Sequence, residues 1–448
     1  MLSHLETNLP LVVVANIAES SINFLPLNHK TTSILVQERQ FKAERSLLWL
    51  GTNKLVFVSY PVPHLGYLQD RLGYAGTTVA TPKKPTAYLS YDIRREQPLL
   101  DQIVAYAGDG QAIRLIPYAN TLQFLALADT LRTECGLEVH LPESPAPEKL
   151  ALYRTIGSKS GFRRQVSGWL PKDHLPTGVI CEHRQAASDA LRWFNAQGKD
   201  CVIKPDRGQA GIGLQVYNHK WSGNGYPPAD EVIREVLASP FLAAENITIE
   251  EFIPSSRRIS PSLEFYLPPS GCGEPEITYL SNQLFSDEVG HFNGVLLSRE
   301  MASAPWLPRF EEDGLTIACN LHEMGYVGHF DLDAVVDDAD RLFLLELNAR
   351  RTGGTHVHEF ALFAFGENYL DDVVLQSQDA MPSGQARSVD ALFSRIDDLL
   401  YPMQGEPRGV VLTISSALPD GRFGCILVAP STEELAVLKD DLVKHLNR

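Results

Sequence analysis

The chain has 448 residues, of which 44% are hydrophobic and 21% are charged, and its formal net charge is −16. This length is enough for two to four structural units with buried cores. The acidic balance argues against nucleic acid as a partner, because phosphate contacts require a basic surface. No apolar run approaches the roughly 20 residues that cross a bilayer, so we expect no membrane partner.

The six cysteines are scattered and form no Cys-x-x-Cys pair. This spacing argues against a zinc site and against a disulfide framework. It is typical of a protein that works in a reducing compartment, and we expect a cytoplasmic location.

Residues 1–148 alternate short apolar runs with helical spacing, which predicts an α/β layer with a mostly parallel sheet. A proline-rich run, Pro142-Glu-Ser-Pro-Ala-Pro-Glu, marks the first domain boundary. The expected strands are Leu11–Ala15, Ser33–Val36, Lys54–Ser59 and Ala112–Pro117, and the expected helix is Leu122–Glu134.

Residues 149–376 mix helices and strands and predict an α+β domain, and residues 385–448 predict a small α+β domain after it. Residues Glu367–Gln376 show helical spacing, and residues 377–385 resemble a linker. A final helix is expected at Thr432–Leu446, with Ser431 or Thr432 near its cap.

A glycine-rich segment begins where the expected strand Cys201–Lys204 ends. Gly208, Gly211 and Gly213 follow Lys204, and a further strand is expected directly after them. Glycine lets backbone N–H groups approach phosphate oxygens, and Lys204 supplies a positive charge beside them. The lysine precedes the glycines, so the segment is neither a P-loop nor a dinucleotide fingerprint. It predicts a β-hairpin lid over phosphates, although an ordinary glycine-rich turn would have the same sequence.

The segment from Asp333 to Arg350 predicts a second β-hairpin, with an acid on each strand. Alternation puts Glu346 and Asn348 on one face, where with Asp333 they offer three oxygen ligands for Mg²⁺. Arg350 could then stabilise charge on a transferring phosphoryl group. A solvent-exposed hairpin is the simpler alternative. Asp331 shares the strand face of Asp333, and we assign it no role.

Two weaker signals complete the pattern. Ile247-Thr-Ile-Glu250-Glu251-Phe-Ile253 predicts a strand end that could present backbone groups to adenine and a carboxylate to ribose hydroxyls. Lys159, in Gly-Ser-Lys-Ser, is a lone lysine that would more often be an ordinary surface residue.

The order and spacing of four elements resemble those of the ATP-grasp superfamily. The elements are Lys159, the glycine loop after Lys204, the strand end Glu250–Ile253, and the hairpin Asp333…Glu346-x-Asn348-x-Arg350. The resemblance implies a two-lobed core that holds ATP. Lys159 and Lys204 would contact its phosphates, the loop of Gly208, Gly211 and Gly213 would close over them, and Glu250, Glu251 and Ile253 would contact adenosine. Asp333, Glu346 and Asn348 would hold Mg²⁺, and Arg350 would be catalytic.

The chain is most similar to the peptide ligases of pheganomycin-type biosynthesis, through Gly328-His-Phe-Asp-Leu-Asp and Asn348-Ala-Arg-Arg-Thr-Gly-Gly-Thr-His. Their layout implies a pre-ATP-grasp domain at 1–148, an ATP-grasp domain at 149–376 and a small domain at 385–448. The expected activity is a carboxylate–amine ligase that forms an amide through an acyl phosphate. Its substrates would be amino acids or small peptides, and we allow for a homodimer. The alternatives are a regulatory nucleotide-binding protein, an acid–thiol ligase or a carboxylase.

Overall fold

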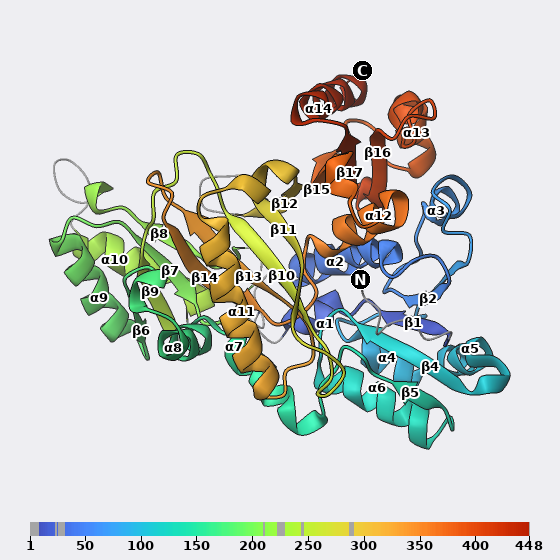
Figure 1. Cartoon of the computed structure of the whole chain (residues 1–448), viewed down its shortest axis with the longest axis horizontal. Helices are drawn as coiled ribbons and strands as arrows, with labels where there is room; N and C mark the ends of the chain where they lie inside the picture. The colour runs from blue at the N-terminus through green and yellow to red at the C-terminus, as the bar shows by residue number, and fades with distance from the viewer. Residues whose placement is uncertain are drawn as a thin grey trace.

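The computed structural model describes residues 9–22, 25, 32–208, 211–221, 229–242, 246–285 and 291–447. Three β-sheets follow one another along the chain, and helices pack against them (Figure 1). The first sheet is parallel and the other two are antiparallel, which confirms the predicted mixture of α/β and α+β structure. Within the described ranges, no helix combines the length and the apolar surface needed to cross a membrane.

The N-terminal sheet has the strand order β3-β2-β1-β4-β5. Its central strand β1 reads Leu-Val-Val-Val and is buried throughout, because a parallel strand covered on both faces carries apolar residues without alternation. The strands are β1 (Leu11–Val14), β2 (Lys54–Phe57), β3 (Thr77–Ala80), β4 (Ala112–Pro117) and β5 (Glu138–His140). The helices are α1 (Ile17–Ser21), α2 (Thr32–Lys42), α3 (Leu65–Arg71), α4 (Leu89–Arg95), α5 (Gln97–Ala107) and α6 (Leu122–Thr133).

The predicted strand Ser33–Val36 is wrong, because these residues lie in helix α2. A short apolar run has the same appearance in a strand and in a helix, and the period alone cannot separate them. The helix buries Arg39, Gln40 and Phe41, whereas Ile34 is 55% exposed. The face of α2 that enters the protein is therefore largely polar.

The second sheet has four strands in the order β6-β9-β7-β8, with helices α9 and α10 packed against it. Phe194 of α9 and Ile233 of α10 share an apolar core with Ile203 and Ile249 of the sheet. The strands are β6 (Gly178–Cys181), β7 (Cys201–Pro205), β8 (Gln215–Tyr217) and β9 (Ile247–Glu251). The helices are α7 (Leu150–Ile156), α8 (Lys159–Trp169), α9 (Arg184–Ala196) and α10 (Ala229–Leu237).

The third sheet has eight strands in the order β14-β13-β10-β11-β12-β15-β17-β16. The strands are β10 (Pro261–Leu267), β11 (Glu276–Phe285), β12 (Phe292–Leu297), β13 (Gly328–Val336), β14 (Leu342–Asn348), β15 (Val374–Pro382), β16 (Gly409–Ile414) and β17 (Arg422–Ala429). The helices are α11 (Leu307–Glu323), α12 (Thr355–Phe365), α13 (Val389–Ile396) and α14 (Thr432–Leu446). The last helix has the predicted bounds, and Ser431 caps it by accepting a hydrogen bond from the Glu434 N–H.

The predicted helix Glu367–Gln376 and the linker after it are wrong, because strand β15 occupies residues 374–382. This strand pairs with β12 on one side and β17 on the other, so the C-terminal strands continue the large sheet. Its sequence escaped recognition because Gln376, Gln378 and Asp379 are buried polar residues that interrupt the apolar pattern of a central strand. The three proposed domain ranges stay predictions.

A buried guanidinium joins the N-terminal region to the large sheet. Arg351, 1% exposed, donates to both Glu143 oxygens at 2.9 and 2.5 Å and to Glu359 of α12 at 3.3 Å. Its backbone N–H donates to the Tyr118 carbonyl, and its guanidinium lies 5.0 Å from the centre of the Trp49 ring. Burial opposes the charge, but Glu143 and Glu359 raise the pKa of Arg351 above its ordinary value.

We predict that Arg351→Met lowers the free energy of unfolding by about 3–5 kcal/mol, because it leaves two buried carboxylates without their cation. Arg341→Met is the matched control, since Arg341 pairs with Asp337 at 2.7 Å but its side chain is 69% exposed. The control should cost at most about 1 kcal/mol. Urea denaturation followed by tryptophan fluorescence measures both, and equal losses would contradict the role of the buried pair.

Candidate functional site

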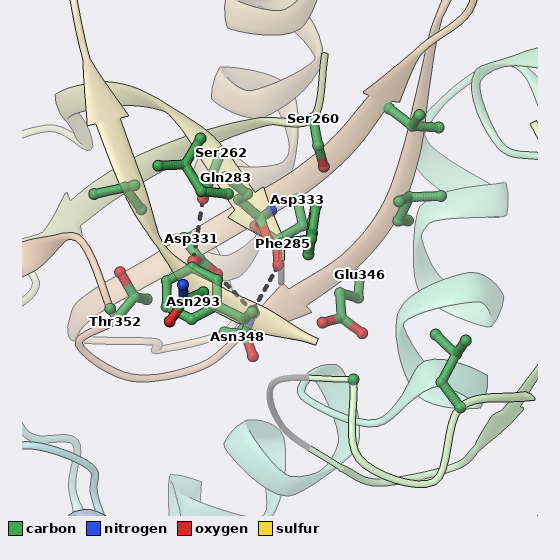
Figure 2. Close-up of a pocket in the computed structure, with 18 of the residues that line it drawn as sticks. Ser260, Ser262, Gln283, Phe285, Asn293, Asp331, Asp333, Glu346, Asn348 and Thr352 are labelled. Carbon is green, nitrogen blue, oxygen red and sulfur yellow. Dashed lines mark hydrogen bonds between the residues drawn. The ribbon is translucent and has the colours of Figure 1, made fainter. Parts of the chain in front are cut away.

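The hairpin of β13 and β14 presents four polar side chains on one face. Asp331 lies opposite Asn348, and Asp333 lies opposite Glu346, in the antiparallel register of the two strands. Because alternate residues of a strand share a face, this register brings all four together. Figure 2 shows Asp331, Asp333 and Asn348 grouped closely, with Glu346 beside them.

Neighbouring strands hold these acids in place. Asp333 accepts hydrogen bonds from the Asn348 amide at 3.0 Å and from the Gln283 amide at 2.6 Å. Asp331 accepts from the Ser262 hydroxyl at 3.2 Å and from the Asn348 backbone N–H at 3.3 Å. Ser262 belongs to β10 and Gln283 to β11, so four strands of the large sheet build this wall (Figure 2).

Burial and mutual repulsion oppose the ionisation of the two aspartates. Burial raises the pKa of Asp333 well above its ordinary value, and the negative charges of Asp331 and Glu346 raise it further. Burial also raises the pKa of Asp331, while Arg350 partly offsets that rise. Glu346 differs, because the positive charges of Lys159 and Lys204 outweigh its burial and lower its pKa. The face therefore carries clustered oxygen donors whose charge a cation would relieve.

Lys159 links the two antiparallel sheets. It is the first residue of α8, and the Ser158 hydroxyl caps that helix by accepting a hydrogen bond from the Gly161 N–H. The Lys159 Nζ lies 2.9 Å from a Glu346 oxygen and donates to the Gly208 carbonyl at 3.2 Å. It therefore contacts both the acidic hairpin and the start of the glycine-rich loop.

Lys204 lies at the end of β7, on the wall opposite the hairpin. Its Nζ is 2.6 Å from one oxygen of Glu250, and Arg163 lies 3.0 Å from the other. The Lys204 and Glu250 side chains are both almost completely buried. The sheet thus delivers a paired lysine to the interior of the cleft.

The glycine-rich loop divides into residues that line the cleft and one that does not. Gly208 and Gly211 line it, whereas Gly213 lies outside the lining. Gly213 has φ +81°, and a Cβ there would lie 2.7 Å from the Phe241 Cβ. Its contribution is the turn geometry that L-residues rarely adopt, together with close packing on Phe241.

The strand end at Glu250, with the residues predicted to contact adenosine, lines the cleft. Glu250 pairs with β6 and β7 through its backbone, and its carboxylate is occupied by Lys204 and Arg163. The Glu251 carboxylate lies 2.7 Å from the Lys199 Nζ. Ile253 lies two residues beyond the last residue of the ladder and lines the cleft.

Arg350 and Arg351 point to different places. Arg350 lines the cleft, donates to the Asn348 side-chain oxygen at 2.7 Å, and lies 5.5 Å from the centre of the Tyr118 ring. Burial disfavours its charge, but Tyr118 and the acids of the hairpin raise the pKa of Arg350 above its ordinary value. Of the two arginines, Arg350 is the one available to a ligand in the cleft.

These side chains line one cleft of about 930 Å³. It brings together most of the sequence-predicted residues: Lys159, Lys204, Gly208, Gly211, Glu250, Glu251, Ile253, Asp333, Glu346, Asn348 and Arg350. The functional roles of these residues stay predictions. Within the described part of the chain, no three His, Cys, Asp or Glu side chains are already arranged to hold a metal.

Several residues of the cleft have no role among those predicted from the sequence. Asp331 carried a usable signal, since the two-residue period puts it on the face of Asp333. Gln283 follows no motif, and its place depends on the pairing of β10, β11 and β13. Arg39 could not be found from sequence, because the first part of its helix was predicted as the strand Ser33–Val36.

No protein-family model and no curated protein matches the sequence. The fold is nevertheless similar to that of N5-carboxyaminoimidazole synthetase from Staphylococcus aureus, with a TM-score of 0.54, 10% identity and 99% of each chain covered. It is also similar to a biotin carboxylase–β-γ-ATP complex from Campylobacter jejuni, with a TM-score of 0.54, 12% identity and coverage of 98% of this chain and 96% of that one.

A third similar structure is the biotin carboxylase domain of the Hydrogenobacter thermophilus 2-oxoglutarate carboxylase, in complex with MgADP, ADP and bicarbonate. Its TM-score is 0.52 at 13% identity, over 98% of this chain and 90% of that one. The shared arrangement extends over nearly the whole chain in all three cases. The chain has the ATP-grasp fold.

Proposed function

We propose that the protein is an ATP-dependent ligase that joins a carboxylate to an amine through an acyl phosphate and releases ADP and phosphate. The observation that carries this proposal is the pairing of two walls in one cleft. One wall bears Asp333, Glu346 and Asn348, and the other bears Lys204 and the glycine-rich loop. The ADP, ATP and MgADP complexes named for similarly folded proteins support ATP as the nucleotide.

When the nucleotide binds, ion pairs to its phosphates would replace the ion pairs that the cleft lysines make with glutamates. Lys159 and Lys204 are paired with Glu346 and Glu250, at 2.9 and 2.6 Å. Phosphate oxygens are stronger partners for these ammonium groups, because they carry more negative charge. The N–H groups of the loop at Gly208 and Gly211 would add hydrogen bonds to the same oxygens.

The hairpin's donor set fits a hard divalent cation, because it consists of carboxylate and amide oxygens. Asp333, Glu346 and Asn348 would hold Mg²⁺, with phosphate oxygens completing the shell that the side chains do not complete alone. When bound, Mg²⁺ would neutralise charge on the phosphate oxygens during transfer. Lys159 and Arg350 would release Glu346 and Asn348, which they hold at 2.9 and 2.7 Å.

The first step of the proposed reaction gives the carboxylate a good leaving group. A carboxylate resists attack by an amine, and phosphorylation by ATP converts it into an acyl phosphate plus ADP. The amine then forms the C–N bond, the C–O bond to phosphate breaks, and the amine loses its proton. Arg350 would stabilise negative charge on the transferring phosphoryl group and on the leaving phosphate. Enclosure of the cleft limits hydrolysis of the intermediate.

The substrates that we propose are amino acids or small peptides in specialised metabolism, as in the pheganomycin-type peptide ligases. A carboxylase is the second candidate, because the similarly folded structures carry carboxylase or carboxyaminoimidazole synthetase names and one contains bicarbonate. The two activities differ in whether the activated acid is an organic carboxylate or bicarbonate. A homodimer and a cytoplasmic location remain part of the proposal.

A screen of carboxylate and amine pairs tests the activity. Full-length protein and MgATP are incubated with each pair, and we expect release of phosphate together with a product whose mass is the sum of both substrates less one water. A parallel series with bicarbonate separates carboxylation from amide formation. Binding of ATP without phosphate release for any pair or for bicarbonate would instead favour a regulatory nucleotide-binding protein.

We predict that Asp333→Asn and Glu346→Gln each lower kcat by about 10²–10³, because each removes a charged ligand opposite the transferring group. Asp340→Asn is the matched control in the turn of the same hairpin, where a side chain 41% exposed pairs with Arg257. Asn is at home in the left-handed conformation of that residue. Full activity of Asp333→Asn with the usual Mg²⁺ requirement would contradict the metal assignment.

We predict that Lys204→Gln raises the KM for ATP roughly tenfold or more, because a charge-assisted hydrogen bond contributes about 1.5–3 kcal/mol. Lys172→Gln is the control, since Lys172 is exposed and lies outside the cleft lining. Steady-state kinetics with varied ATP measure both variants. Equal effects would contradict a specific role of Lys204.

A further inference from the structure

One end of the cleft is built by parts of the chain that lie outside the nucleotide walls. Helix α2 lies between the N-terminal sheet and α12 (Figure 1), and its residues reach the cleft beside strand β15 and helix α14. We call this part the basic end, and it consists of Arg39, Lys42, Arg45, Asp379 and Lys439. Four of these five described residues are cationic, in a chain whose net charge is −16.

The single carboxylate of the basic end is already shared by two cations. Asp379 accepts hydrogen bonds from Arg45 at 3.0 and 2.9 Å and lies 3.1 Å from the Lys42 Nζ. Burial opposes its charge, but Arg45 and Lys42 lower the pKa of Asp379 to about 2. This carboxylate is therefore ionised and occupied, which makes it a poor site for a substrate ammonium. The surplus charge of the basic end is positive.

Arg39 is a buried cation of the basic end. It is 8% exposed yet lines the cleft. Burial and the positive charges of Arg350 and Arg45 lower the pKa of Arg39 to about 10, although Tyr118 and Glu38 partly offset them. The guanidinium stays charged at neutral pH and can attract an anion in the cleft.

The basic end is also lined by side-chain amides, which can donate hydrogen bonds to an anion. Gln376 and Gln378 of β15 line the cleft, and the Asn293 amide donates to the Gln378 side-chain oxygen at 3.1 Å. Because Gln378 accepts in that contact, its amide N–H groups can donate to a ligand. Buried guanidinium groups with amide donors beside them are the usual surroundings of a bound carboxylate or phosphate.

We propose that the basic end binds an anionic group, a carboxylate or a phosphate, carried by the substrate whose other end reacts at the hairpin. This inference rests on the proposed function, because it names the class of molecule that the ligase accepts. Such a substrate would have two functional groups: one that reacts beside Arg350, and one anion that Arg39 and Lys42 bind. A neutral analogue of the same length would lose most of its affinity.

Binding measured without turnover tests the inference independently of the ligase activity. Calorimetry with full-length protein compares glutarate with glutaramide, and glycerol 3-phosphate with glycerol. We expect one anion to bind at least tenfold more tightly than its neutral partner, and the two pairs distinguish a carboxylate from a phosphate. Arg39→Gln and Lys42→Gln should each weaken that binding about tenfold.

Two exposed residues outside the cleft provide matched controls. Arg154→Gln and Lys172→Gln remove the same charges from the surface and should leave anion binding unchanged. Equal affinity for anion and neutral analogue, or unchanged binding in Arg39→Gln, would overturn the inference even if MgATP and an amine release phosphate. Anion binding that depends on Arg39 without any phosphate release would instead overturn the ligase and leave the anion site standing.

Discussion

The arrangement of the cleft depends on the positive charge of the Arg351 guanidinium, which must be paired. Arg351 is buried, and a buried guanidinium is tolerated only where carboxylates meet it. Those carboxylates come from Glu143, before the second sheet, and from Glu359 of α12. Because Arg351 is held from both directions, the neighbouring Arg350 is turned into the cleft and lies against Tyr118. Arg351 and its two carboxylate partners thus join the N-terminal region to the hairpin of β13 and β14.

A third buried carboxylate fixes the segment that follows the hairpin. Glu264 of β10 accepts hydrogen bonds from the hydroxyl groups of Thr352, Thr355 and Tyr279, at 2.6, 3.1 and 2.7 Å. Thr352 and Thr355 flank the glycines that follow the hairpin. The segment leading from the hairpin into α12 is therefore fixed by side-chain contacts rather than by strand pairing. Rigid support of this kind is what positions a charged side chain accurately.

Sequence alone was sufficient for the hairpin and insufficient for the basic end of the cleft. Asp333, Glu346 and Asn348 follow from strand alternation and from the resemblance of their spacing, both of which are local. Strand β15 and helix α2 were misassigned because their inward faces carry polar residues, among them Gln376 and Arg39, which hide the usual periodicity. The contact of Arg45 with Asp379 joins residues 334 positions apart, and no local pattern predicts such a pair.

The central position of β15 has a consequence for how this molecule could change. Since β15 pairs with β12 and with β17, the strand that carries Gln376 and Asp379 is also the seam between the cleft and the C-terminal strands. A chain that ended before β17 would leave β15 as an open sheet edge and expose its backbone groups. The C-terminal strands are thus an integral part of the large sheet and cannot be removed without exposing β15. Single side-chain changes on α2 and β15 would instead alter the lining of the basic end and leave the hairpin intact.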